Sequence, residues 1–145
     1  MSQVEDFLSV KEEEEIVNAI RQAERNTSGE IRVHIERTTN ISHYNRAIEV
    51  FRVLKMFNTK EQNAVLLYIA VDDHKFVIYG DKGVDAVVPD NFWDTTKDLI
   101  QGYFKSGDFK QGIVEGVLKV GEKLKAHFPW NEDDVDELPN EVSKG

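Results

Sequence analysis

Acidic side chains are the residues of this sequence whose type and spacing best suit a chemical task. Asp72 and Asp73 directly follow an unbroken apolar run from Ala64 to Val71. Ligands of open α/β sheets gather at the carboxyl ends of strands, and paired carboxylates there offer the hard oxygen atoms that Ca²⁺ and Mg²⁺ prefer. Asp108, in a tight link between the last two expected helices, is the leading third ligand. We therefore predict a Ca²⁺ or Mg²⁺ site formed by these three aspartates.

A second acidic set, Glu30 and Asp81, is expected at the opposite end of the sheet, because Asp81 ends a strand that runs back from the first site. This topology makes it hard for both sets to share one ion. Each set also has a structural alternative. Asp72 and Asp73 suit a hairpin turn, Asp108 suits a helix N-cap, and Glu30 suits an ion pair at the edge of the sheet.

The sequence lacks the motifs of several other kinds of catalytic and metal-binding site. The absence of cysteine excludes disulfides, thiolate zinc sites, iron–sulfur clusters and cysteine nucleophiles. The four histidines show no paired ligand spacing, and there is no G-x-S-x-G nucleophile motif. The segment Gly80-Asp81-Lys82-Gly83 lacks the spacing of a phosphate-binding loop and indicates a turn. Asp134 and Asp136 lie in a polar tail, whereas an aspartyl-phosphate pair needs the end of a buried strand.

The elements that must position the acidic groups follow from the spacing of apolar residues. The expected order is α-β-α-β-β-α-α. A first helix lies between a Ser9–Glu12 capping box and Asn26, and a strand over 30–36 and a helix over 43–57 follow. Strands over 64–71 and 75–79 come next, then a helix from about Phe92 to near Gly107 and a last helix capped by Asp108 with Gln111.

The direction of the strands follows from their connections. A helical crossover makes the first two strands parallel, and a tight turn makes the third antiparallel. The first strand alternates Ile31, Val33 and Ile35 with polar residues and should have one wetter side, whereas the second is apolar on both faces. Helices must then cover both faces of a small mixed β-sheet. The predicted fold class is α/β, a three-layer α/β/α sandwich.

Length and charge limit the classes of partner. The 145 residues suffice for one domain, which we assign to residues 1–130. Residues 131–145 hold six of the 27 acidic and one of the 18 basic side chains, which indicates an acidic, flexible tail. The alternative is a strand or short helix that folds back on the domain through Val135 and Leu138. The net charge of −9 argues against nucleic acid and membrane surfaces. No signal peptide or apolar stretch long enough for membrane insertion is present, so a cytoplasmic location is expected.

Four segments of the sequence resemble the TPM domain family in the right order and with the right spacing. They are Asp6-Phe7-Leu8-Ser9, residues 27–33 (TSGEIRV), residues 63–83 (NAVLLYIAVDD running into VIYGDKG) and residues 104–113 (FKSGDFKQGI). The resemblance covers roughly residues 6–128. It implies an α/β/α sandwich and a divalent-cation site, commonly for Ca²⁺, lined by acidic side chains at one end of the sheet. Carried over, it implies the same ligands: Asp72, Asp73 and Asp108, with Glu30 and Asp81 as the second set.

The resemblance implies two kinds of function. Some family members are plastid lumenal proteins tied to photosystem II repair and labelled acid phosphatases, and others are membrane-anchored and act on partner proteins. We expect a non-catalytic TPM domain that binds a divalent cation and a protein partner. The alternatives are a metal-assisted acid phosphatase and a structural adaptor. Only lysines (Lys75, Lys82, Lys105 and Lys110) and no arginine are expected near the candidate loops, and this shortage of bases favours the non-catalytic form.

Overall fold

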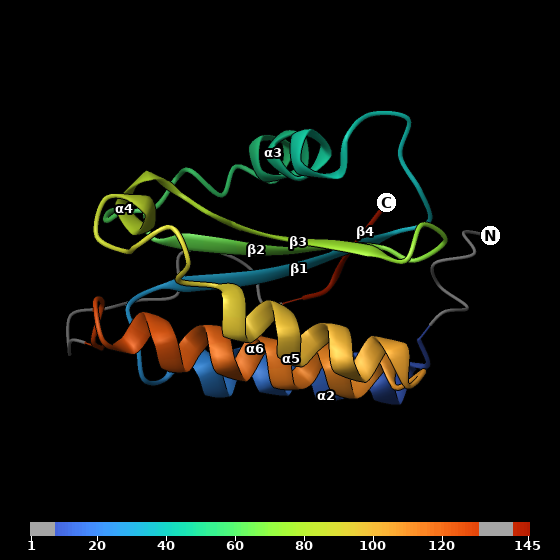
Figure 1. Cartoon of the computed structure of the whole chain (residues 1–145). Helices are drawn as coiled ribbons and strands as arrows, with labels where there is room; N and C mark the ends of the chain where they lie inside the picture. Colours follow the sequence, from blue (N-terminus) through green and yellow to red (C-terminus); the bar gives the residue numbers. More distant parts are fainter. Residues whose placement is uncertain (1–7, 131–140) are drawn as a thin grey trace.

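The structure is a computed structural model that describes residues 8–130 and 141–145. Within these residues, a four-stranded sheet of strand order β3-β2-β1-β4 lies between layers of helices (Figure 1). β1 is parallel to β2 and to β4, and β3 is antiparallel to β2. The predicted α/β/α sandwich with a mixed sheet is confirmed. Its strands are β1 (Glu30–Glu36), β2 (Ala64–Ala70), β3 (Lys75–Gly80) and β4 (Ser143–Lys144).

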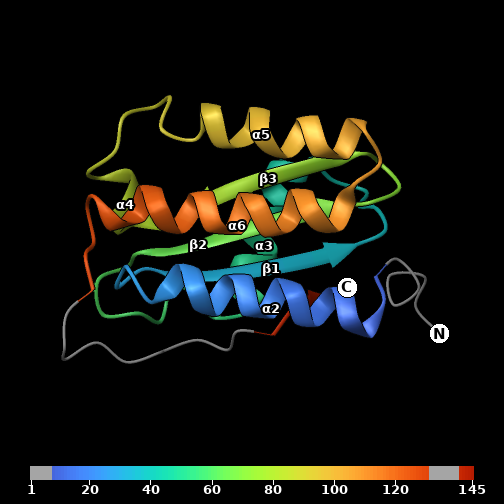
Figure 2. The same ribbon diagram turned by 90° about the horizontal axis from the view of Figure 1, so that it is seen from below.

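Helices cover both faces of the sheet, as the apolar run of β2 predicts. One face carries α2 (Val10–Glu24), α5 (Asp94–Lys105) and α6 (Phe109–Lys125), which lie side by side (Figure 2). The other face carries α3 (His43–Val53), and the short helix α4 (Lys82–Asp85) follows β3. Within the described residues, no helix is long and apolar enough to cross a membrane.

The two faces of β2 belong to two separate apolar cores. Val65 and Leu67 pack with side chains of α2 and α6 in the larger core, whereas Leu66 and Tyr68 pack with those of α3 in the smaller one. All seven residues of β2 are buried. Burial of apolar surface is the main favourable term in folding, so this central strand is the fixed reference for the loops at its ends.

The helix ends agree with the sequence in one case and differ in two. The predicted capping box of Ser9 and Glu12 is present at the start of α2. The predicted side-chain cap of α6 is wrong, because Asp108 takes the N-cap position without a capping hydrogen bond. Helix α3 ends at Val53, earlier than predicted, since Lys55 adopts a left-handed conformation with φ of 57° that stops the helix.

Strand β1 has the predicted limits, but its predicted wetter side is buried. Glu30, Arg32, His34 and Glu36 are each 3–7% exposed. The side chains of the last two have partners from other elements, which alternation along a single strand does not reveal. These partners belong to α3, β2 and β4. A strand that looks half polar therefore contributes a buried polar layer.

The end of the segment predicted as a flexible tail is part of the sheet. Residues His34 and Ile35 of β1 pair with Ser143 and Lys144 of β4, and the Gly145 N–H donates to the Ile35 carbonyl at 2.9 Å. The physical reason is that β1 would otherwise leave its outer backbone groups unpaired at a sheet edge. The alternative contact through Val135 and Leu138 lies outside the described residues.

Candidate functional site

The predicted metal ligands Asp72 and Asp73 lie where the carboxyl ends of β1 and β2 meet. The two chains stay paired beyond the strands, because the Asp72 N–H donates to the Arg37 carbonyl at 2.8 Å. The segments that follow β1 and β2, residues 37–42 and 71–74, therefore lie at the same end of the sheet (Figure 1). We call these two segments the rim.

Asp72 is held by an exposed ion pair. Arg37 Nε donates to Asp72 Oδ2 at 2.9 Å, and both side chains are close to half exposed. Ion pairs of this kind contribute at most about 1 kcal/mol, because water screens the two charges. The Asp72 carboxylate is thus open to a competing cation.

Asp73 is more fully engaged than Asp72. The Thr38 hydroxyl lies 2.8 and 2.9 Å from the two carboxylate oxygens of Asp73, and His43 Nε2 donates to Oδ2 at 2.9 Å. The hydrogen bonds from His43 and then Thr38 lower the pKa of Asp73. Asp73 therefore remains ionised and presents its negative charge to the rim.

The remaining predicted ligands lie elsewhere. Asp108 is exposed in the link between α5 and α6, where Gly107 has a φ of 81°. Glu30 and Asp81 are buried on the two sides of Ala64 at the opposite end of β2, and Asp81 Oδ1 accepts from the Lys82 N–H at 2.8 Å. Across residues 8–130 and 141–145, no three His, Asp or Glu side chains come close enough to hold a metal ion.

Next to the rim lies a buried polar cluster that the sequence did not reveal, centred on Glu36. Arg46 Nε and Nη2 donate to the two oxygens of Glu36 at 2.9 and 2.8 Å, and Arg46 Nη1 donates to Glu49 at 2.6 Å. The Tyr68 hydroxyl donates to Glu36 Oε2, and His34 Nε2 lies 3.1 Å from Glu36 Oε1. Three side chains, from β1, β2 and α3, thus share the Glu36 carboxylate.

The electrostatics of this cluster keep Glu36 charged. Burial raises the pKa of Glu36, but the hydrogen bonds from Arg46, Tyr68 and His34 outweigh burial and lower the pKa to about 2. Burial lowers the pKa of His34, so its imidazole is neutral at pH 7. Because His34 Nε2 faces a carboxylate, that nitrogen carries the proton and Nδ1 accepts from the Ser143 hydroxyl at 3.0 Å.

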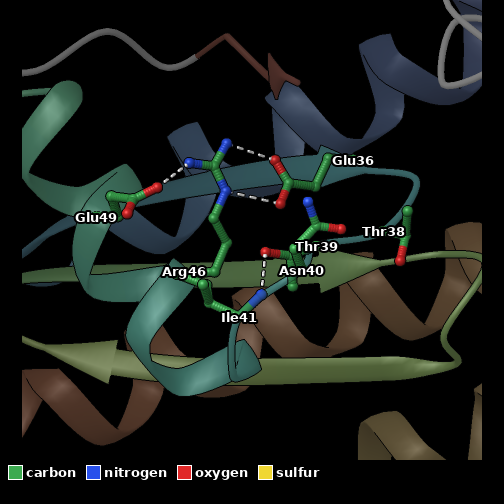
Figure 3. Close-up of a pocket in the computed structure, with 7 residues that line it drawn as sticks. All are labelled: Glu36, Thr38, Thr39, Asn40, Ile41, Arg46 and Glu49. Carbon is green, nitrogen blue, oxygen red and sulfur yellow. Dashed lines mark hydrogen bonds and ion pairs between the residues drawn. The ribbon is translucent and has the colours of Figure 1, made fainter.

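A polar pocket of about 320 Å³ joins the Glu36 cluster to the rim (Figure 3). Arg46 lies between the carboxylates of Glu36 and Glu49, and the Ile41 N–H donates to Thr39 Oγ1. The pocket offers hydroxyl, amide and carboxylate oxygens beside Asp73. The residues that line it are Glu36, Thr38, Thr39, Asn40, Ile41, Arg46 and Glu49.

The expectation that no arginine lies near the candidate loops is wrong. Arg37 contacts Asp72, and Arg46 lines the pocket. The sequence held a signal for Arg37, because that residue directly follows β1, at the same end of the sheet as the residue that follows β2. It held none for Arg46, whose orientation depends on how α3 packs.

Comparison with known proteins gives the family. A protein-family model described as TPM domain matches residues 1–123. The NMR structure of the BA42 protein from the psychrophilic bacterium Bizionia argentinensis is similar to the whole chain. It shares 60% identity, has a TM-score of 0.93 and is covered over 100% of both chains. The comparison with curated proteins gave no match.

Two more distant structures share the fold. The N-terminal domain of a P. gingivalis protein has 24% identity and a TM-score of 0.69, with 83% of this chain and 78% of that chain covered. The N-terminal domain of the cg2496 protein from Corynebacterium glutamicum has 11% identity and a TM-score of 0.66, with coverage of 90% and 81%. The match over residues 1–123 and the fold agree with the resemblance seen in the sequence, and the chain belongs to the TPM domain family.

Proposed function

We propose that this TPM domain binds a divalent cation, Ca²⁺ or Mg²⁺, at the rim. The observation that carries the proposal is the pair of adjacent carboxylates, Asp72 and Asp73, at the carboxyl end of the buried strand β2. A cation there would compete with Arg37 for Asp72 and would take the place of the proton that Thr38 donates to Asp73. Both exchanges release only exposed contacts, which cost little to break.

The other ligands would come from neutral oxygens and water. Ca²⁺ takes six to eight oxygen ligands, and Mg²⁺ keeps several waters, so two carboxylates suffice as anchors for either ion. The Thr38 hydroxyl can rotate its lone pairs toward the ion. Asp108, in the link between α5 and α6, is the proposed third carboxylate, and it would have to approach the rim when an ion binds, because no three such side chains of the described residues lie close together in the structure. Glu30 and Asp81 form a separate, second candidate pair at the other end of β2.

A titration followed by backbone amide NMR tests the cation site. Adding Ca²⁺ or Mg²⁺ should shift amide signals of residues 37–42 and 71–74, and Asp72→Asn or Asp73→Asn should weaken binding at least tenfold, because each removes a charged ligand. Asp108→Asn decides whether the third ligand takes part. Asp98→Asn, an exposed aspartate of α5, is the matched control and should change nothing. Shifts confined to other residues, or no heat in calorimetry, would refute the site.

Within this proposal, the domain acts as a non-catalytic module for a protein partner. Support comes from Arg46, the arginine that lines the pocket, since it is paired with both Glu36 and Glu49. Paired guanidinium groups are poorly placed to hold a transferring phosphoryl group, which requires positive charge aimed at it.

A metal-assisted acid phosphatase is the second candidate function, and one observation favours it. Arg37 Nε lies 2.9 Å from Asp72 Oδ2, so a guanidinium group and a candidate metal ligand share the rim. Bound metal could neutralise a phosphate and activate water there. Hydrolysis of an aryl phosphate with and without Mg²⁺ tests this function. Turnover that requires Mg²⁺ and is lost in Asp72→Asn and Arg37→Gln would replace the non-catalytic proposal.

A further inference from the structure

A second pocket, of about 480 Å³, opens between the β2–β3 turn and the α5–α6 link. Its walls are aromatic and come from three different elements. Phe76 of β3 makes an edge-to-face contact with Phe104 of α5, with ring centroids 5.6 Å apart. Phe104 also packs against Phe109 of α6 at 5.1 Å. The volume is in the range of small-molecule sites, which are mostly apolar with a few polar groups.

The aromatic wall is fixed in place by the helix α6. A Cβ atom added to Gly112 would lie 2.8 Å from Phe104 Cε1, so the absence of a side chain at Gly112 lets the Phe104 ring rest against α6. Phe76 and Phe104 also pack against the larger apolar core. The pocket is therefore formed without a ligand, which lowers the conformational cost of binding one.

The remaining side chains around the pocket are donors of hydrogen bonds. Lys105, Gln101 and His74 line it together with the rings, and none of the carboxylates in the described part of the chain lines it. Lys105 belongs to none of the ion pairs that the described residues form. Asp108 lies between two lining residues without lining the pocket itself, and Asp73 is engaged by Thr38 and His43. Although the chain has a net charge of −9, the charged group that lines this apolar pocket is thus the positive ammonium group of Lys105.

We propose that this pocket binds a small amphipathic carboxylic acid, with its apolar body among Phe76, Phe104 and Phe109 and its carboxylate at Lys105. Aromatic rings provide the area for an apolar body, and a charge-assisted hydrogen bond from an ammonium selects an anionic head over a neutral one. Gln101 offers a second donor to the same head. The proposal does not rest on the cation site, since none of the proposed cation ligands lines this pocket.

Three probes with one apolar body test the pocket: 3-phenylpropanoate, 3-phenylpropanol and 3-phenylpropylamine, each titrated into the ¹⁵N-labelled protein in the presence of a chelator. The acid should shift amide signals of residues 74–76 and 101–109 and saturate. We expect the alcohol to bind about tenfold more weakly, since it lacks the charge-assisted hydrogen bond, and the amine more weakly still.

Variants of Lys105 distinguish the proposed contact between Lys105 and the carboxylate from non-specific binding of apolar molecules to the aromatic rings. Lys105→Gln should remove the preference for the acid over the alcohol, and Lys105→Glu should reverse the preference toward the amine. Lys97→Gln, on the same helix and outside the pocket, is the matched control and should keep the wild-type order. Because Lys105 is exposed, these changes should leave the fold intact, which the undisturbed amide spectrum verifies.

Equal binding of acid and alcohol to the wild type, tightest binding of the amine, or shifts outside the pocket would each overturn the proposal. Asp72→Asn should leave the acid titration unchanged. Failure of the acid to bind while the Ca²⁺ titration succeeds would therefore reject this pocket alone and leave the proposed cation site in place.

Discussion

At the scale of single residues, Glu36 is the group on which the buried polar cluster depends. Glu36→Gln removes the charge that Arg46 and Tyr68 contact and should destabilise the protein by about 2 to 3 kcal/mol, because a buried partner of a charged group is lost. Glu49→Gln is the control: Glu49 binds the same Arg46 but is exposed, so its loss should cost under about 1 kcal/mol. Urea unfolding measures both, and equal effects would contradict the assigned role of Glu36.

The same carboxylate predicts how stability depends on pH. The pKa of Glu36 falls from the ordinary 4.5 to about 2 in the folded protein. A depressed carboxyl pKa stabilises the fold fully above pH 4.5, and this contribution, about 3 kcal/mol, is lost as the pH falls from 4.5 to about 2. Urea unfolding between pH 7 and pH 2.5 should show this loss. In Glu36→Gln the slope over that range should be clearly shallower, and an unchanged slope would contradict the assignment.

At the scale of elements, the two helix N-caps differ in whether the side chain makes a hydrogen bond within the fold. Ser9 caps α2 through its side chain, whereas Asp108 begins α6 without a capping hydrogen bond. We expect Ser9→Ala to destabilise the protein by about 1 kcal/mol and Asp108→Ala by less than about 0.5 kcal/mol. Thermal unfolding of the two variants checks the difference. A large loss in Asp108→Ala would mean that its carboxylate has a structural task and is not reserved for a ligand.

The elements also show what the sequence could predict. Apolar spacing located β1, and the turn at Asp72 and Asp73 located the rim, because both signals are local. The burial of Glu36 was not predictable in this way. Its partners Arg46 and Tyr68 lie 10 and 32 positions away, and Ser143 of β4 lies 109 positions after its partner His34, so only the packed fold brings these residues together. For the same reason the partners of Asp73 were missed.

At the scale of the whole molecule, the C-terminal end of the chain lies in the sheet and contacts α2, the first described helix. The last residues extend the sheet beside β1, the Ser143 hydroxyl reaches His34, and Lys144 pairs with Glu13 of α2. Through His34 these contacts connect to Glu36 and so to the pocket beside the rim. The end of the segment that its charge predicted to be a tail therefore helps to hold the candidate site, through the contact of Ser143 with His34 and of His34 with Glu36.

Deleting residues 141–145 tests this connection. The deletion removes the pairing of β4 with β1, uncovers His34 and leaves its contact to Ser143 unmade, so we expect the Tm to fall by about 3 to 6 °C. Ser143→Ala, which keeps the backbone pairing and loses only the hydroxyl, should lower the Tm by a smaller amount. In the intact protein, the Gly145 amide, which donates to the Ile35 carbonyl, should be protected from hydrogen exchange. Two results together would contradict this connection: rapid hydrogen exchange at the Gly145 amide and an unchanged Tm after the deletion. They would show that the sheet ends at β1 in solution and that the Glu36 cluster is held by α3 and β2 alone.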